Sequence, residues 1–226
     1  MKAVYLVAIG SLICLAPGTT VAAQGRGTTP QAAATDVYHV HFAKAAPGQA
    51  AALAADLQKQ DPKAPMPGHL VLLRHQEGDD WDYCVIEHLG TKATVEITPA
   101  PAASAPPLGA WHNDSFVAGP SWAAFQRALG STATGVYIVS THRAVPGHRD
   151  QLLKVLNQAD PASKVPIGRV MLTHLEGGPW QYLGIDHYNS WQDLATDRAS
   201  SGTPGTWAEV RMHSAFHTDT IADRVK

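Results

Sequence analysis

The chain has 226 residues, of which 45% are hydrophobic and 16% are charged, and its formal net charge is −2. This near-neutral balance gives no electrostatic reason to expect nucleic acid or an anionic membrane surface as a partner. The chain has two cysteines, Cys14 and Cys84. Because Cys14 lies in a segment that we expect to be removed, we predict no internal disulfide and a buried, inert thiol at Cys84.

The N-terminal residues have the features of an export signal. Lys2 is the only charge before an apolar stretch that ends at Leu15, and small residues follow up to Ala23. The apolar stretch is too short to span a bilayer. We therefore predict a cleaved signal peptide at 1–23, a disordered linker at 24–34, a periplasmic or secreted protein, and no membrane partner after cleavage.

The rest of the chain contains an internal repeat. A shift of 99 positions superposes 35–90 on 134–189 without a gap, with 21 of 56 positions identical. Unrelated sequences share far fewer, so the chain contains two copies of one unit. We expect repeat 1 at 35–117, a linker helix at 118–133 and repeat 2 at 134–226.

Each copy begins with alternating residues rich in Val, Tyr, Ile and Thr, at 37–43 and 136–142. This pattern predicts a strand. Leucines four residues apart follow, Leu53 and Leu57 in the first copy, and they form the apolar stripe of a short helix. An Asp-Pro pair ends the helix, because a residue before proline avoids the helical conformation.

A hairpin is predicted next. Gly78 in the first copy and Gly177 in the second begin the turn between two extended runs, which is a hairpin signal. The expected strands cover 69–76 and 81–88 in the first copy and 168–175 and 180–187 in the second.

A second helix and a last strand complete each copy. The helix is clear at 190–199 but weak in the first copy, where 99–107 is rich in Ala and Pro. The last strand is expected at 111–116 and 216–221, after an insertion of about six residues in the second copy. Thr206 and Glu209 predict a capped helical turn inside this insertion. The order β-α-β-β-α-β is that of a ferredoxin-like unit and indicates an α+β fold.

The hairpin register determines which side chains share a face of the sheet. One face is aliphatic in both copies, and we expect the helices to pack on it. Its members are Val71, Leu73, Cys84 and Ile86, with Val170, Leu172, Leu183 and Ile185. The opposite face is amphipathic and keeps a Trp and a Tyr in each copy. If it were exposed it would form a large apolar patch, so we expect the two such faces to cover each other.

This arrangement resembles the dimeric α+β barrel superfamily, in which two ferredoxin-like units pack sheet to sheet; here the two units are fused in tandem. The resemblance covers most of the chain at the level of topology and transfers no functional residue. It implies a range of functions: cofactor-free oxygenases acting on polycyclic phenols, haem enzymes such as chlorite dismutases, haem-degrading enzymes, and members without known chemistry. The exported, fused layout is most similar to chlorite dismutases, but the chain has no haem-ligand motif.

The candidate catalytic residues form a His-x-Asp motif that recurs in both copies, at His112 and Asp114 and at His217 and Asp219. On a strand, residues i and i+2 point to the same side, so each His and Asp share a face. A carboxylate that orients an imidazole can act as a general base or contribute to a metal site. The alternative is a structural network at the barrel mouth.

The candidate ligand-binding residues follow from the face assignment. If Tyr38, Val40 and Phe42 face the helices, the alternate histidines of that strand enter the barrel and form a polar end in an aromatic cavity. The alternative is a filled interface with polar groups only at the rim. The expected ligand-binding set is His39, His41, Arg74, Trp81, Tyr83, Glu87, Trp180, Tyr182 and Asp186.

The leading functional hypothesis is the binding of a small aromatic or carbonyl compound between the repeats. If the protein is an enzyme, we expect cofactor-independent oxygenase or isomerase chemistry. The alternatives are a non-catalytic structural protein and a haem- or metal-binding enzyme. No metal site or cofactor is predicted, because the sequence has neither tight metal-ligand spacing nor a phosphate-binding or nucleophile motif. Free sheet edges leave a homodimer open.

Overall fold

The computed structural model describes residues 35–59, 62–91, 108–130, 135–158, 166–200 and 206–226. The expected signal peptide (1–23), the expected linker (24–34) and the weakly predicted helix of the first copy (99–107) lie outside these residues. Among the described residues, no helix has both the length and the apolarity needed to cross a bilayer.

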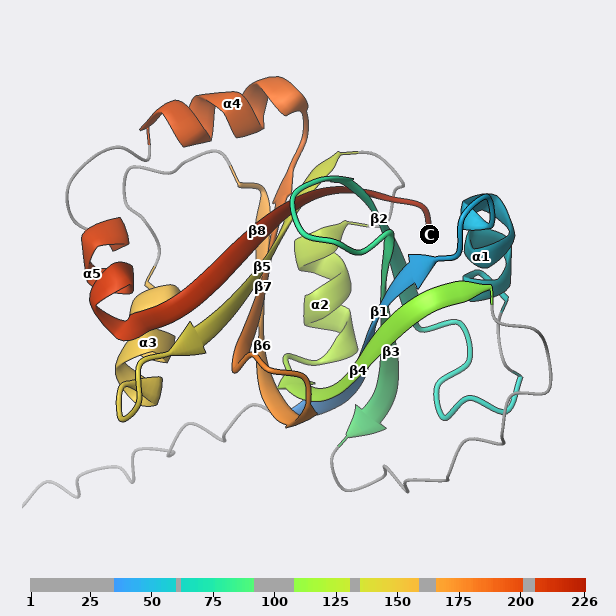
Figure 1. Ribbon diagram of the computed structural model, residues 1–226. Helices are drawn as coiled ribbons and strands as arrows, with labels where there is room; N and C mark the ends of the chain where they lie inside the picture. Colours follow the sequence, from blue (N-terminus) through green and yellow to red (C-terminus); the bar gives the residue numbers. More distant parts are fainter. Residues whose placement is uncertain (1–34, 60–61, 92–107, 131–134, 159–165, 201–205) are drawn as a thin grey trace, which may run out of the picture. The chain divides into compact units, whose positions relative to one another are not determined.

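The described part of the chain contains eight strands and five helices (Figure 1). Repeat 1 contributes β1 (Asp36–Ala45), α1 (Ala50–Leu57), β2 (Leu70–Glu77), β3 (Tyr83–Thr91) and β4 (Gly109–Gly119). The linker forms α2 (Trp122–Leu129). Repeat 2 contributes β5 (Val136–Ala144), α3 (Arg149–Leu156), β6 (Gly168–Gly177), β7 (Tyr182–Tyr188), α4 (Trp191–Ser200), α5 (Thr206–His213) and β8 (Ser214–Arg224). The sequence predicted each of these elements, but the predicted last strands of the two repeats, 111–116 and 216–221, are shorter than β4 and β8.

The strands form one closed antiparallel barrel in the order β1-β3-β2-β8-β5-β7-β6-β4. Each repeat supplies four neighbouring strands in the same internal order, β4-β1-β3-β2 and β8-β5-β7-β6. The outer strands of the two repeats then pair with each other, β2 with β8 and β4 with β6. The expected α+β class is therefore confirmed. The eight described strands close into a barrel within one chain, so none of them offers the free sheet edge on which the expectation of a homodimer rested.

The structure reverses the expected faces of the sheet. The aliphatic set, including Leu73, Cys84 and Leu183, lies inside the barrel in one core cluster drawn from both repeats. The prediction that the helices of the repeats pack on this face is wrong, because α1, α3 and α5 pack on the opposite one. Both faces of each sheet are largely apolar, so alternation along a strand could not decide which of them points inward.

The linker helix α2 supplies the inner packing that the sequence analysis did not anticipate (Figure 1). Its Phe125 and Leu129 are fully buried in the same core as the inner faces of both repeats. Phe125 stacks on Tyr38 with ring centroids 5.0 Å apart, and the Tyr137 hydroxyl donates to the carbonyl of Leu129 at 2.9 Å. The expected bridging helix is thus part of the barrel interior.

The outer face of the sheet packs against the other helices. Leu72, Tyr83 and Val85 lie in a cluster with Leu53 of α1, and Tyr182 lies in a second cluster with Leu152 of α3 and Val210 of α5. The tyrosine hydroxyls donate to the first turn of these helices, since Tyr83 reaches Ala50 O at 3.0 Å and Tyr182 reaches Arg149 O at 2.9 Å. These two tyrosines therefore hold helices in place outside the barrel.

Two hairpin glycines make the contacts between repeats possible. Gly78 and Gly177 both have positive φ, 129° and 105°. A Cβ on Gly78 would lie 2.6 Å from the carbonyl oxygen of Asp219, and a Cβ on Gly177 would lie 2.2 Å from that of Asp114. Each of these glycines therefore has two roles: it allows the turn, and its lack of a side chain lets the hairpin lie against the backbone of the other repeat.

Candidate functional site

An aromatic cleft opens at one end of the barrel, between the two repeats. It is a cavity of about 410 Å³. We use the name aromatic cleft for the space whose walls are Phe42, Trp81, Trp111, Trp180 and Phe216. The remaining lining residues are Asp79, Asp80, Asn113, Thr141, Arg143 and Pro179.

The cleft follows the internal symmetry of the chain. Trp81 and Trp180 are equivalent residues of the two hairpins and are almost fully buried, with 3% and 5% exposure. Both lie near Phe42, at ring-centroid distances of 5.4 and 6.5 Å. The prediction that these tryptophans meet between the repeats is confirmed. They turn inward because the chain leaves the regular strand before Tyr83, which begins β3.

Two exposed aromatic residues form the outer walls of the cleft. Trp111 of β4 and Phe216 of β8 occupy equivalent positions and are 39% and 48% exposed. Neither residue belongs to the ligand-binding set predicted from the sequence. A signal was present, because each repeat has an aromatic residue directly before its His-x-Asp motif. Large apolar side chains that remain exposed around one cavity are typical of a binding surface.

Charged groups lie at the rim of the cleft. The Arg143 guanidinium lies 5.6 Å from the ring centroid of Phe216, within the range of a cation–π contact. Asp80 pairs with Lys44 at 2.8 Å, and Asp79 accepts a hydrogen bond from the hydroxyl of Thr218 at 3.1 Å. The cleft therefore combines apolar walls with a few polar groups that could orient a substituent.

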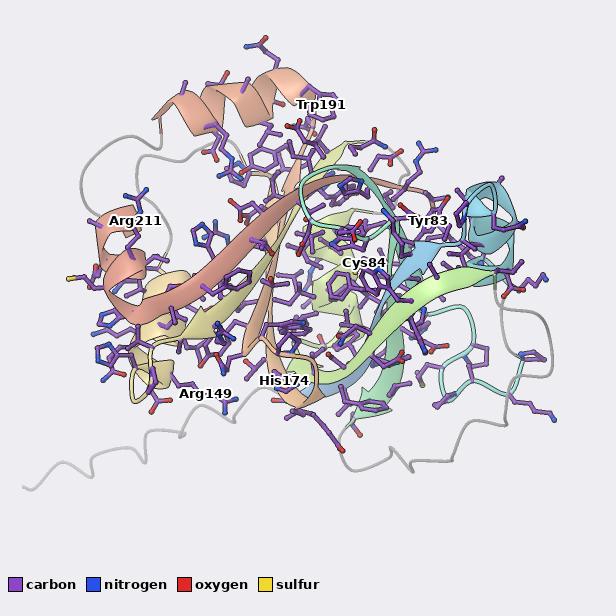
Figure 2. All side chains as sticks on the ribbon, in the orientation of Figure 1. Tyr83, Cys84, Arg149, His174, Trp191 and Arg211 are labelled. Carbon is purple, nitrogen blue, oxygen red and sulfur yellow. The ribbon has the colours of Figure 1, made fainter. Side chains whose placement is uncertain are left out.

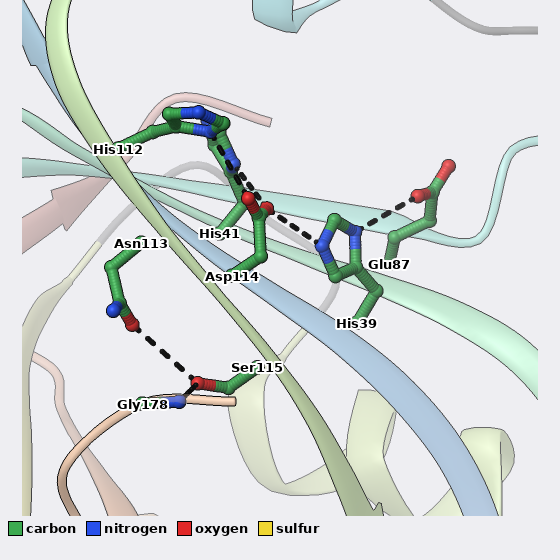
Figure 3. A network of polar contacts seen from close by, with 8 residues as sticks. All are labelled: His39, His41, Glu87, His112, Asn113, Asp114, Ser115 and Gly178. Carbon is green, nitrogen blue, oxygen red and sulfur yellow. Dashed lines mark hydrogen bonds and ion pairs between the residues drawn. The ribbon is translucent and has the colours of Figure 1, made fainter. Parts of the chain in front are cut away.

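The expected catalytic pair of repeat 1 faces away from this cleft. Strand β4 alternates, so Trp111 and Asn113 line the cleft while His112 and Asp114 lie on the outer face of the sheet (Figure 3). His112 Nδ1 is 3.0 Å from Asp114 Oδ2, which confirms that the two share a face. A general base acting from this pair inside the inter-repeat cavity is not compatible with that placement.

The outer face instead holds a histidine–carboxylate cluster, which we define as His39, His41, Glu87, His112 and Asp114. Asp114 Oδ1 lies 2.7 Å from His41 Nδ1 and 2.9 Å from His39 Nε2. Glu87 Oε2 lies 3.7 Å from His39 Nδ1. The prediction that His39 and His41 enter the barrel is wrong, because Tyr38, Val40 and Phe42 are the inward residues of β1.

Burial and the neighbouring charges act in opposite directions on these groups. Burial lowers the pKa of His39, but hydrogen bonds to Glu87 and Asp114 outweigh it, so the pKa is raised above its ordinary value. For His41 burial prevails over Asp114, and the pKa is lowered. Burial raises the pKa of Asp114, but the two imidazoles lower it by more than burial raises it. The pKa of Asp114 is therefore below its ordinary value.

The equivalent position in repeat 2 is built differently. Asp219 Oδ1 accepts a hydrogen bond from Ser140 Oγ at 2.6 Å, and its Oδ2 pairs with Arg198 Nη2 at 3.1 Å. His217 stacks on His142 with ring centroids 5.9 Å apart. The two His-x-Asp motifs, although alike in sequence, therefore lie in different surroundings.

The remaining predicted residues form ion pairs outside the cleft. Arg74 of β2 pairs with Asp223 of β8, with Nε 3.0 Å from Oδ1, so it joins the two repeats. Asp186 of β7 pairs with Arg169 of β6. Of the predicted ligand-binding residues, the structure places only Trp81 and Trp180 in the aromatic cleft.

These features define an antiparallel α+β barrel with an aromatic cleft between two repeats. No protein-family model and no curated protein matches the sequence. Among solved structures, the chain is similar to one described as an anthrone oxidase-like protein, with a TM-score of 0.63 and 13% sequence identity. The match covers 85% of this chain and 92% of the other. At this identity the likeness shows a shared fold.

Proposed function

We propose that this chain consists of two fused ferredoxin-like units and binds a planar aromatic compound in the aromatic cleft between them. The observation that carries the proposal is the pair of exposed aromatic residues, Trp111 and Phe216, at equivalent positions around one cavity. Burying their surface against a flat ligand would stabilise a complex at roughly 25 cal/mol per Å² of apolar area. The Trp81 and Trp180 rings provide the base of the same site.

The fold likeness supports the choice of ligand. The similar solved structure is described as an anthrone oxidase-like protein, and anthrone is a flat, three-ring ketone. A cavity of about 410 Å³ lies in the range of small-molecule sites. Arg143 at the rim is placed to meet a carbonyl or phenolate oxygen of such a compound. We therefore propose a polycyclic phenol or ketone as the ligand class.

Tryptophan fluorescence and calorimetry with anthrone test this proposal on the full-length chain. We expect saturable binding by the wild type and roughly tenfold weaker binding by Trp111→Ala and by Phe216→Ala, which is about 1.4 kcal/mol for each lost wall. Trp191→Ala is the matched control, because Trp191 is also an exposed tryptophan, 54% exposed, but lies on α4 outside the cleft (Figure 2).

Two results would contradict the proposal. One is the absence of saturable binding by the wild type. The other is an equal loss of affinity in Trp111→Ala and Trp191→Ala, since that pattern would mean binding to exposed tryptophans in general. Oxygen uptake after anthrone addition separates binding from oxidation. If the wild type consumes oxygen and Phe216→Ala does not, an oxidase reaction is assigned to the cleft. If the wild type binds anthrone but consumes no oxygen, the protein is a binding protein.

A further inference from the structure

We propose that His39, His41 and Asp114, on the outer face of β1 and β4, bind a divalent first-row transition-metal ion. One ligand atom from each residue lies within 4.8 Å of the other two. Two imidazoles and one carboxylate form a donor set that suits such ions and leaves coordination positions open. This site is separate from the aromatic cleft and goes beyond the function proposed for it.

The strands position the three ligands. His39 and His41 are two residues apart on β1, so both point to the outer face. In the pairing of β1 with β4, His41 lies directly opposite Asp114. Ligands on two paired strands of a closed barrel are held more rigidly than ligands on loops, and rigid placement is what a metal site requires.

Glu87 and His112 lie behind the proposed ligands, where outer-sphere partners of a metal ion would lie. His39 directs Nε2 toward Asp114 and Nδ1 toward Glu87, so a carboxylate lies behind a candidate metal-binding imidazole (Figure 3). Asp114 directs Oδ1 toward the two histidines and Oδ2 toward His112. Metal-binding histidines and carboxylates commonly have such partners, which fix their orientation.

Repeat 2 provides an internal comparison. There the equivalents of His39 and His41 are Ile138 and Ser140, and a guanidinium from Arg198 lies beside the carboxylate of Asp219. Repeat 2 thus places a permanent cation beside the aspartate that repeat 1 surrounds with imidazoles. Equivalent carboxylates in the two repeats therefore have different partners: imidazoles in repeat 1 and a guanidinium in repeat 2.

The proposed ligands are accessible in the part of the chain that the structure describes. The side chains of His39, His41 and Asp114 are 26%, 20% and 40% exposed. An ion could therefore enter, and water or an exogenous ligand could complete its coordination. Because Asn113 and Ser115 occupy the opposite face of β4 (Figure 3), this coordination would not involve the aromatic cleft.

The test is a Co²⁺ titration of tag-free, full-length protein, followed by visible absorption and by competition with Zn²⁺. We expect one equivalent to bind with the d–d bands of a protein-bound ion. The loss variant is His41→Ser, because serine is the residue that repeat 2 uses beside its own aspartate. We expect its affinity to fall at least tenfold, and His112→Asn to lower affinity by about 10- to 100-fold as an outer-sphere partner.

His217→Asn is the matched control, since it removes the histidine of the equivalent motif in repeat 2 and should leave Co²⁺ affinity unchanged. The proposal is overturned if the wild type shows no protein-bound Co²⁺, or if His41→Ser binds as tightly as His217→Asn. If His41→Ser does not fold, NMR of the wild type still tests the site. Paramagnetic broadening by Co²⁺ must centre on the backbone amides of residues 39, 41 and 114, and broadening centred elsewhere rejects the site. Unchanged anthrone binding in folded His41→Ser would separate this result from that for the cleft.

Discussion

Asp114 and Asp219 occupy the same position in the two repeats, but their carboxylates are compensated by different groups. Asp114 lies between two histidines, at 2.7 and 2.9 Å. Asp219 accepts a hydrogen bond from Ser140 and pairs with Arg198. The first arrangement is the one that we propose as a metal site, whereas the second places the permanent positive charge of Arg198 beside the carboxylate.

The Ser140 hydroxyl should therefore contribute to stability. In Ser140→Ala the partly buried carboxylate of Asp219 loses a 2.6 Å hydrogen bond. Hydrogen bonds to charged groups contribute about 1.5–3 kcal/mol, and we expect the free energy of unfolding to fall by about 2 kcal/mol in urea denaturation. Thr196→Ala removes an exposed hydroxyl that donates to the carbonyl of Gln192 within α4 and should change stability by less than about 0.5 kcal/mol. Equal effects in the two variants would contradict the assignment.

Gly147, in the loop between β5 and α3, and the hairpin glycine Gly177 offer a second test, because backbone strain can be separated from close packing. Gly147 and Gly177 both have positive φ, but a Cβ on Gly147 would meet nothing within 4 Å, while one on Gly177 would meet the backbone of β4. We expect Gly147→Ala to cost about 1 kcal/mol from backbone strain and Gly177→Ala about 3 kcal/mol from strain and overpacking together. Thermal and urea denaturation provide the comparison. Similar losses would mean that the approach of the hairpin to β4 does not limit stability.

Much of the fold could be read from the sequence because the repeat supplied each signal twice. The order and approximate positions of the strands, the helix at Leu53 and Leu57, and the hairpin register that sets Arg74 opposite Tyr83 all follow from local patterns. Which face of each sheet points into the barrel could not be predicted from local patterns. The interior depends on where α2 packs, and the Trp122, Phe125 and Leu129 stripe shows only that this helix is amphipathic, not which surface it covers.

The site was harder to predict for a related reason. His39 and Asp114 are 75 residues apart and meet only because β1 pairs with β4. Both residues are candidates from the sequence, but both were expected in the cavity between the repeats, whereas they meet on the outer face of the sheet. The aromatic cleft was found in part, since Trp81 and Trp180 were predicted to meet, whereas Trp111 and Phe216 could be assigned only once the barrel end was known.

The thiol of Cys84 should react only after unfolding. Cys84 is fully buried in the barrel core, and burial raises the pKa of the thiol. In a Cys14→Ser variant, where Cys84 is the only thiol, we expect no reaction with an aromatic disulfide reagent under native conditions and one equivalent in urea. Fast native labelling would mean that the core around Cys84 opens readily.

Stability should fall in mild acid because of His142. This side chain is 3% exposed, and burial lowers its pKa to about 4, with Asp219 opposing and His217 and Arg169 adding to the effect. An unfolded histidine has a pKa of about 6.5, so the unfolded chain binds the proton first as the pH falls. This group therefore has no effect above about pH 6.5, destabilises the fold progressively toward pH 4, and costs at most about 3 kcal/mol. Urea denaturation at about pH 7.5 and about pH 5 should show a smaller loss for His142→Gln than for the wild type, and equal losses would exclude His142 as the source.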